Sequence, residues 1–319
     1  MPMKLGIREI NSMIEQFGLE TVQAYMGHVQ DNAEECIRSA ITELKEGNYD
    51  YRLDNGEFIK VKIKINHVNR EAIIDFTGTA KKNPLNYNAP VAVCHAVILY
   101  VFRTLVGKNI PLNEGCFKPL KIIIPDNSMI NAKYPSAVIA GNTEVSQLTC
   151  NALFGALGVI AGSQATMNNF IWGNDRIQNY ETICGGTGAG PDFHGTSAVQ
   201  THMTNTRSTD PEVLELRFPV RLEEFSIRKN SGGLGKFNGG DGATRKLRFL
   251  DKMTVTTLCS HRKIQPFGVA GGKPGECGKE WLEKKDGTII ELQGNDCCKV
   301  EEQDLFVMLT PGGGGFGLK

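Results

Sequence analysis

A histidine in a run of hydrogen-bonding side chains is the first candidate for chemistry in this sequence. His202 lies in Thr201-His-Met-Thr-Asn-Thr-Arg207, between hydroxyl and amide groups. Because a histidine titrates near neutral pH, His202 is suited to act as a general acid or base. A structural histidine bonded to backbone is the alternative. We take His202 and Asn205 as catalytic candidates and Thr204 as a substrate-binding candidate.

A glycine-rich loop precedes this segment. Glu181 stands just before Gly185-Gly-Thr-Gly-Ala-Gly190, as a candidate general base or an ordinary surface glutamate. Gly185, Gly186 and Gly188 are substrate-binding candidates, because glycine lets backbone approach a ligand closely. A P-loop would end in Gly-Lys-Ser/Thr, and a dinucleotide loop would open a helix where this loop has proline. The loop therefore does not predict phosphate binding.

Asn142 and Thr143 form a third polar group, directly before an apolar stretch that reaches Ala161. Asparagine and threonine at a helix start favour an N-cap, and we prefer that interpretation to substrate binding. Both interpretations stay open at this point.

Hydrophobic periodicity predicts the elements that must position these residues. Residues 7–45 have helical spacing with a hinge near Gly18, and 57–66 alternate apolar and basic residues as a strand that pairs with 71–76 through a hairpin. Two further helices, 91–106 and 142–161, are apolar nearly all round and should be buried. Beyond Pro211, short strands separated by glycine turns predict an antiparallel sandwich or barrel-like module.

These elements predict an α+β protein, with a mixed α/β core of buried helices followed by a β-rich antiparallel C-terminal module. We expect a helical N-terminal segment over residues 1–48, the mixed core with its glycine-rich loop over 49–210, and the β-rich domain over 211–319.

Composition excludes several classes of function. The 35 basic and 35 acidic residues cancel, so no long-range field favours nucleic acid. No apolar stretch reaches the roughly 20 residues of a membrane helix, and the N-terminus lacks an apolar signal core, which predicts a cytoplasmic chain. Nine cysteines without a CxxC spacing indicate reduced thiols. Only Cys297 and Cys298 are close, and neighbours on a strand point to opposite faces, so we predict no bound metal.

Three stretches, in order, resemble the hydantoinase B/oxoprolinase family. Weaker matches lie upstream, at Asn83-Pro-Leu-Asn-Tyr-Asn, Asn113-Glu-Gly-Cys-Phe and Ala140-Gly-Asn-Thr-Glu-Val-Ser-Gln. The resemblance spans nearly the whole chain, and the order of the motifs makes it specific. The three main stretches are 181–215, which contains the glycine loop and His202, then Ser231-Gly-Gly-Leu-Gly-Lys-Phe-Asn-Gly-Gly-Asp-Gly, and the terminal Thr310-Pro-Gly-Gly-Gly-Gly-Phe-Gly.

The resemblance implies a role in ATP-dependent opening of a cyclic amide, 5-oxoproline or a hydantoin. It implies a hydantoinase A-type partner subunit that binds ATP, with ATP and a divalent metal present in the full complex and no cofactor on this chain. Relatives that carboxylate ketones supply one alternative. A non-catalytic scaffold half of a split enzyme is another.

Two departures from the family pattern shape these expectations. The family's amino-terminal Asn-Asp-Pro, Gly-Gly-Thr-His and His-His-x-Asp stretches do not occur here, so we expect a missing N-terminal half to carry the metal ligands and the isolated chain to be inactive. Gln200 stands where relatives have a histidine. The apolar helices would be exposed without that half, which predicts either its docking or a homo-oligomer.

Overall fold

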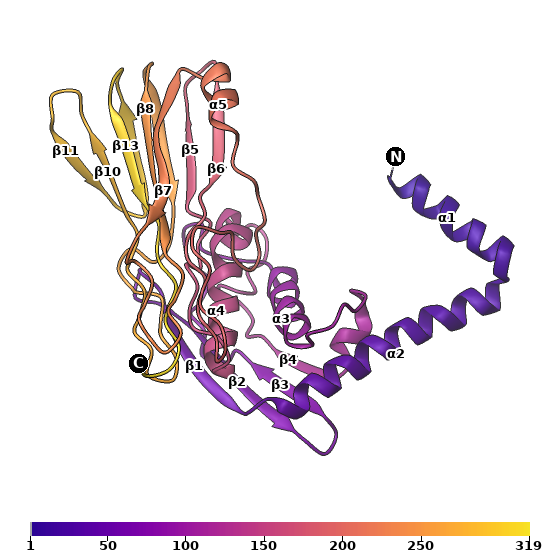
Figure 1. Cartoon of the computed structure of the whole chain (residues 1–319). Helices are drawn as coiled ribbons and strands as arrows, with labels where there is room; N and C mark the ends of the chain where they lie inside the picture. The colour runs from indigo at the N-terminus through magenta and orange to yellow at the C-terminus, as the bar shows by residue number, and fades with distance from the viewer. Residues whose placement is uncertain (1) are drawn as a thin grey trace.

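The N-terminus forms a two-helix arm. A computed structural model describes residues 2–319, beginning with α1 (Pro2–Phe17) and α2 (Leu19–Glu43). The chain bends between them at Gly18, whose positive φ of 81° suits glycine, and the predicted hinge is confirmed. Only the second half of α2 packs on the body, through Ala33, Ile37 and Ile41. Figure 1 shows α1 and the start of α2 extending away from the rest of the molecule.

A four-stranded sheet follows, in the order β1-β2-β3-β4. Its strands are β1 (Gly47–Arg52), β2 (Phe58–Asn66), β3 (Glu71–Asp75) and β4 (Leu120–Ile123), with only the β3–β4 pair parallel. In β2 the residues Ile59, Val61 and Ile63 are buried while the intervening lysines face outward, as the alternation predicted. The predicted hairpin between β2 and β3 is confirmed.

Two helices pack against this sheet. All of α4 (Ser146–Leu157) except Gly155 is buried, which confirms the prediction of a buried helix although it ends four residues earlier than expected. For α3 (Val91–Leu105) the same prediction is wrong, because only one face is buried. The other face carries Ala96, Leu99 and Tyr100 and borders a cleft. Short turns of 3₁₀ and π helix, Glu114–Phe117 and Gly141–Val145, precede β4 and α4.

The remaining strands form two sheets packed face to face. The orders are β11-β10-β13-β8-β7 and β12-β9-β5-β6. Phe170 and Phe306 stack between them with ring centroids 4.4 Å apart, so the predicted sandwich is found (Figure 1). The elements are β5 (Asn169–Gly173), β6 (Gln178–Thr182), α5 (Pro211–Arg217), β7 (Val220–Arg228), β8 (Gly242–Phe249), β9 (Met253–Leu258), β10 (Lys279–Glu283), β11 (Ile289–Leu292), β12 (Asn295–Val300) and β13 (Leu305–Leu309).

The sandwich contains strands from both sides of the expected boundary at residue 210. The hairpin of β5 and β6 precedes that boundary, yet β5 pairs with β9 along its whole length. Residue 210 therefore lies within one structural unit that begins at β5, and the division at 210 does not separate the sheets.

Glycine-rich loops pack together beneath the sandwich. Backbone N–H groups of one loop donate to carbonyls of the next, from Gly240 to Thr187 (2.9 Å) and from Gly313 to Gly240 (2.8 Å). A Cβ on Gly188 would collide with the carbonyl of Ala161, and one on Gly313 with that of Thr187. The three glycine motifs therefore form one backbone-packed bundle that only glycine allows.

Candidate functional site

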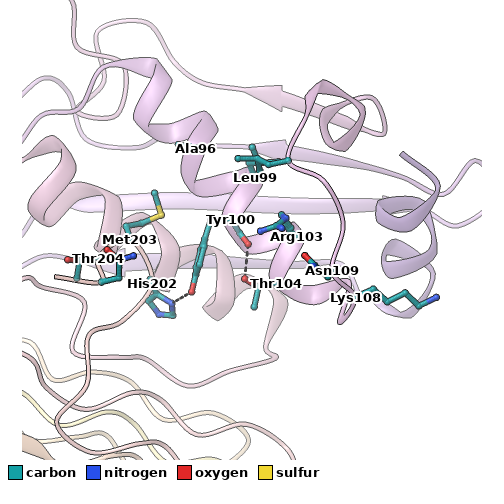
Figure 2. A pocket seen from close by; sticks show the side chains of 12 residues that line it. Ala96, Leu99, Tyr100, Arg103, Thr104, Lys108, Asn109, His202, Met203 and Thr204 are labelled. Atoms are coloured by element: carbon teal, nitrogen blue, oxygen red, sulfur yellow. Dashed lines mark hydrogen bonds between the residues drawn. The ribbon is translucent and has the colours of Figure 1, made fainter. Parts of the chain in front are cut away.

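Three of the predicted site residues, His202, Thr204 and Asn205, line a cleft of about 610 Å³ beside α3. Its walls are the exposed face of α3, the loop that follows α3, and the segment 202–205. Figure 2 shows the side chains of these elements around one opening. The lining residues are Ala96, Leu99, Tyr100, Arg103, Thr104, Lys108, Asn109, Leu112, His202, Met203, Thr204 and Asn205.

His202 is held at one edge of this cleft. Its Nδ1 lies 3.2 Å from the hydroxyl of Tyr100, and its ring lies between Tyr100 and Phe154, at centroid distances of 5.7 and 5.2 Å. The backbone of His202 has a positive φ of 49°, which is unusual for a residue with a side chain. Nε2 is buried and has no hydrogen-bond partner within residues 2–319.

Burial lowers the pKa of His202 to about 4. The imidazole is therefore neutral near pH 7, when one nitrogen donates and the other accepts. A neutral ring is in the state required of a base, but a low pKa makes it a weak one. This low pKa suits hydrogen bonding to a ligand better than proton abstraction.

The charged groups of the cleft are both cations. Arg103 donates from Nη2 to the carbonyl of Ile110 (2.7 Å), which holds the loop after α3 in place, and Lys108 lies further along that loop. Among the described residues that line the cleft there is no aspartate or glutamate. Such a lining attracts an anionic ligand.

Thr204 and Asn205 line the cleft beside His202, so the structure brings these three candidates together. The backbone N–H of Thr204 donates to the carbonyl of Thr201 (3.4 Å), which closes a turn around His202. Their hydroxyl and amide groups can donate to and accept from a ligand.

Glu181 does not line the cleft. Its carboxylate forms an ion pair with Arg245, Oε2 to Nη2 at 2.7 Å, in which both side chains are buried. Asn179 donates to the other oxygen (3.2 Å). Because Glu181 lies on β6 and Arg245 on β8, the pair joins the two sheets, a structural role that differs from the expected general base.

Gly185, Gly186 and Gly188 are also outside the cleft lining. They belong to the glycine bundle, where Gly186 donates to the carbonyl of Pro311 (3.0 Å). Gly185 exchanges two backbone hydrogen bonds with Val199, at 3.1 and 2.9 Å. The loop thus fixes the segment that leads to His202, and its visible contacts are with protein backbone.

Asn142 and Thr143 do not cap a helix. They lie inside the π-helical turn before α4, whose cap position is Ala140 and has no side-chain cap bond. Asn142 is exposed, and neither residue lines the cleft. The capping interpretation is wrong because the turn already begins at Gly141, so that both residues lie inside it.

Sequence reasoning missed Glu144, the next residue in that turn. Its side chain is fully buried, and Oε1 accepts from the N–H of Met167 (3.1 Å) and from Asn169 (2.8 Å). Burial raises the pKa of Glu144 to about 7, and the neighbouring side chains of Ser260 and Thr166 oppose that rise only in part. An acidic residue inside a stretch expected to be a buried helix was the signal that could have revealed it.

Two further polar side chains near the glycine loop have structural partners. Gln200 donates to the carbonyl of Thr182 (3.2 Å), and His194 accepts from the N–H of Asn238 (2.9 Å) inside the glycine bundle. Within residues 2–319 no three His, Cys, Asp or Glu side chains form a group that could hold a metal ion. No helix of that part of the chain is both long and apolar enough to span a bilayer.

Comparison with known proteins places the chain in a family. Residues 2–319 match the hydantoinase B/oxoprolinase family model, so the chain belongs to the hydantoinase B/oxoprolinase family. It is 44% identical over 329 residues to 5-oxoprolinase 1 of Arabidopsis thaliana, and 40% identical over 324 residues to 5-oxoprolinase of Dictyostelium discoideum. In each case the match covers 98% of this chain and 26% of the relative. The chain therefore spans about a quarter of the length of these curated relatives.

Two solved structures share the fold. ATP-dependent caprolactamase from Pseudomonas jessenii superposes with a TM-score of 0.84 at 21% identity, covering 98% of this chain and 59% of that one. Acetone carboxylase gives 0.81 at 16% identity, covering 97% and 50%. At these identities the likeness establishes the fold.

Proposed function

We propose that this chain forms part of an ATP-dependent hydrolase that opens 5-oxoproline, and that its cleft holds the substrate. The observation that carries the proposal is the cationic lining of Arg103 and Lys108 next to His202. The 5-oxoprolinase relatives, at 40 and 44% identity, favour the same substrate.

The chemistry of 5-oxoproline matches this lining. Its carboxylate would lie against Lys108 and Arg103, where charge-assisted hydrogen bonds are strong. Its ring amide would reach His202, Thr204 and Asn205, which offer donors and acceptors. A hydantoin ring has no carboxylate, so the same cations favour 5-oxoproline over a hydantoin.

The reaction needs groups that we propose to lie elsewhere in a complex. Hydrolysis adds water across the ring C–N bond and releases glutamate, coupled to cleavage of ATP. We propose that a hydantoinase A-type subunit binds ATP, that a further polypeptide equivalent to the family's N-terminal half supplies a divalent metal, and that the complex is cytoplasmic. The isolated chain is then inactive.

We propose that a partner binds to the helical arm formed by α1 and α2. An apolar groove of about 680 Å³ runs between α1 and α2. Exposed apolar side chains of this extent are typical of surfaces that another polypeptide covers, the family's N-terminal half or a second copy of this chain. The groove is lined by Met13, Phe17, Thr21, Val22, Tyr25, Met26, Val29, Gln30 and Asn113.

Turnover by an assembled complex tests the function. The chain is combined with the A-type subunit and the remaining B polypeptide, and glutamate and ADP are measured with 5-oxoproline as substrate. Equal, ATP-dependent formation of both products supports the proposal. Incorporation of labelled bicarbonate into acetone, without ring opening, would show the ketone carboxylase alternative. A complex that forms and turns over neither substrate would identify the chain as a scaffold.

A further inference from the structure

A single loop borders both the cleft and the apolar groove of the helical arm. It runs from Val106, the C-terminal cap of α3, to Asn113, the N-terminal cap of the 3₁₀ turn before β4. Lys108, Asn109 and Leu112 of this loop line the cleft, whereas the next residue, Asn113, lines the groove between α1 and α2. The cleft and the groove therefore share one stretch of backbone.

One arginine attaches the first part of this loop to α3. Arg103 donates to the carbonyl of Ile110 from both Nε (3.2 Å) and Nη2 (2.7 Å). The chain turns at Gly107, whose positive φ of 64° suits glycine. Figure 2 shows Lys108 and Asn109 beyond the end of α3 that carries Arg103. Because Lys108 lies between Gly107 and Ile110, the course of this backbone sets the position of its cation.

An asparagine attaches the other end of the loop to the arm. Nδ2 of Asn113 donates to the carbonyl of Val29, in the middle of α2 (3.3 Å), while its Oδ1 accepts from the N–H of Gly115 (2.8 Å). One amide group therefore caps the 3₁₀ turn and joins it to α2. A Cβ on Gly115 would collide with the carbonyl of Gln30, so the turn packs directly on the helix backbone. These contacts give the Asn113-Glu-Gly-Cys-Phe motif a structural role.

The contact with Asn113 lies where the arm leaves the body of the molecule. Val29 is 40% exposed, and Tyr25 and Met26, one turn earlier, are 65 and 48% exposed. The part of α2 that packs on the core begins at Ala33. A change in the direction of the arm therefore acts on the helix turn to which Asn113 is bonded.

We propose that Asn113 is a positioning residue, which makes the position of Lys108 in the cleft depend on the helical arm. Asn113 holds the loop against α2, and the backbone between Asn113 and Gly107 carries that position to the cation. A polypeptide that fills the groove also contacts Asn113. Its binding and ligand binding in the cleft are then coupled, and each changes the affinity of the other by the same factor. The inference rests on the proposed function only in taking 5-oxoproline as the ligand of the cleft.

Two substitutions loosen the loop from the arm at different atoms. Asn113→Ser removes the donor to α2, while the serine hydroxyl can still accept from the N–H of Gly115 and cap the turn. Gly115→Ala leaves Asn113 in place but pushes the turn away from α2. Asn174→Ser is the matched control. In the turn between β5 and β6, Asn174 likewise donates to a carbonyl, of Lys252 (3.2 Å), and accepts from an N–H, of Arg176 (3.0 Å).

NMR order parameters of the 319-residue chain measure the loop directly. We expect the values for residues 107–112 to fall from about 0.85 to below about 0.6 in Asn113→Ser and in Gly115→Ala, and to stay unchanged in Asn174→Ser. The dispersion of the sandwich amides in the same spectra reports whether each variant is folded. An equally rigid loop in the wild type and in both loop variants would overturn the inference.

Kinetics of the assembled complex test the link to Lys108. Asn113→Ser should raise KM for 5-oxoproline about fivefold with little change in kcat, and should have no further effect in a chain that carries Lys108→Met. Independent effects of the two substitutions would overturn the inference. A loosened loop in a chain whose complex does not open 5-oxoproline would support the coupling and contradict the proposed function, so the two failures are distinguishable.

Discussion

The hydroxyl of Tyr100 and Nδ1 of His202 lie 3.2 Å apart, joining α3 to the segment that follows the glycine loop. The two residues are 102 positions apart in the sequence. Phe154 of α4 covers another side of the imidazole ring. The ring is therefore fixed at the edge of the cleft by three elements, and the glycine bundle fixes the segment that carries it.

Replacing Tyr100 by phenylalanine tests this relationship. Tyr100→Phe removes the hydrogen bond but keeps the aromatic packing, so we expect kcat for ring opening to fall about fivefold, as loss of a bond of about 1 kcal/mol implies. KM should change less. Steady-state kinetics of the assembled complex measure both. Tyr134→Phe is the control, because Tyr134 is 99% exposed, and equal kinetics of the two variants would count against a role for the bond.

The lowered pKa of His202 predicts a dependence of stability on pH. Between about pH 6.5 and 4 the unfolded chain binds a proton at His202 that the folded chain does not, so stability falls as pH falls through this range. Above pH 6.5 the imidazole is neutral in both states and the effect is absent. Urea unfolding at pH 4.5 and 7 should show a smaller stability loss for His202→Gln than for the wild type. An equal loss in both proteins would mean that His202 is accessible to protons.

The glycine bundle predicts a sharp contrast between two glycines. Gly188→Ala places a Cβ against the carbonyl of Ala161 and should destabilise the fold by more than about 3 kcal/mol, as strained backbone contacts do. Gly27→Ala, on α2, meets nothing within 4 Å and should stabilise the helix by up to about 1 kcal/mol. Thermal unfolding of both variants measures the contrast. Similar melting temperatures of the two variants would show that the glycine loops can shift to accommodate the added Cβ atom.

The buried ion pair of Glu181 and Arg245 predicts that removing one partner destabilises the fold and that removing both restores much of the stability. Glu181→Leu leaves Arg245 buried without its partner, at a cost of about 3–5 kcal/mol. The double variant Glu181→Leu/Arg245→Met should recover much of that loss. Denaturant unfolding of the single and double variants gives the coupling energy. If the single variant were fully stable but its assembled complex inactive, Glu181 would be a catalytic residue as the sequence suggested.

Local patterns predicted the local structure well. The alternation in β2, the hinge at Gly18 and the buried α4 were all found, because each depends on residues close in the sequence. The sandwich was expected from its short strands, but the pairing of β5 with β9 was not, and it joins residues 81 to 89 positions apart. Such register is set by tertiary packing that a single sequence does not display.

The candidate site was predicted only in part, because many of its contacts also join residues far apart in the sequence. The run of polar residues around His202 marked the segment that enters the cleft. The partners of Glu181 and of the glycine loop come from β8 and from the C-terminal glycines, far along the chain. The cationic side of the cleft was missed because Arg103 lies near the end of a helix expected to be wholly buried, and Lys108 lies in the loop that follows that helix. Because the sequence did not predict an exposed face on α3, it did not link these two cations to His202.

The most direct test of the central claim is the KM for 5-oxoproline in the assembled complex, with and without the cation of Lys108. If the cleft holds the substrate carboxylate, Lys108→Met should raise KM about tenfold, as loss of a charge-assisted bond implies, and change kcat little. Lys4→Met, on the distant helix α1, is the matched control. An unchanged KM in Lys108→Met, in a complex that forms glutamate at the expense of ATP, would contradict binding in this cleft.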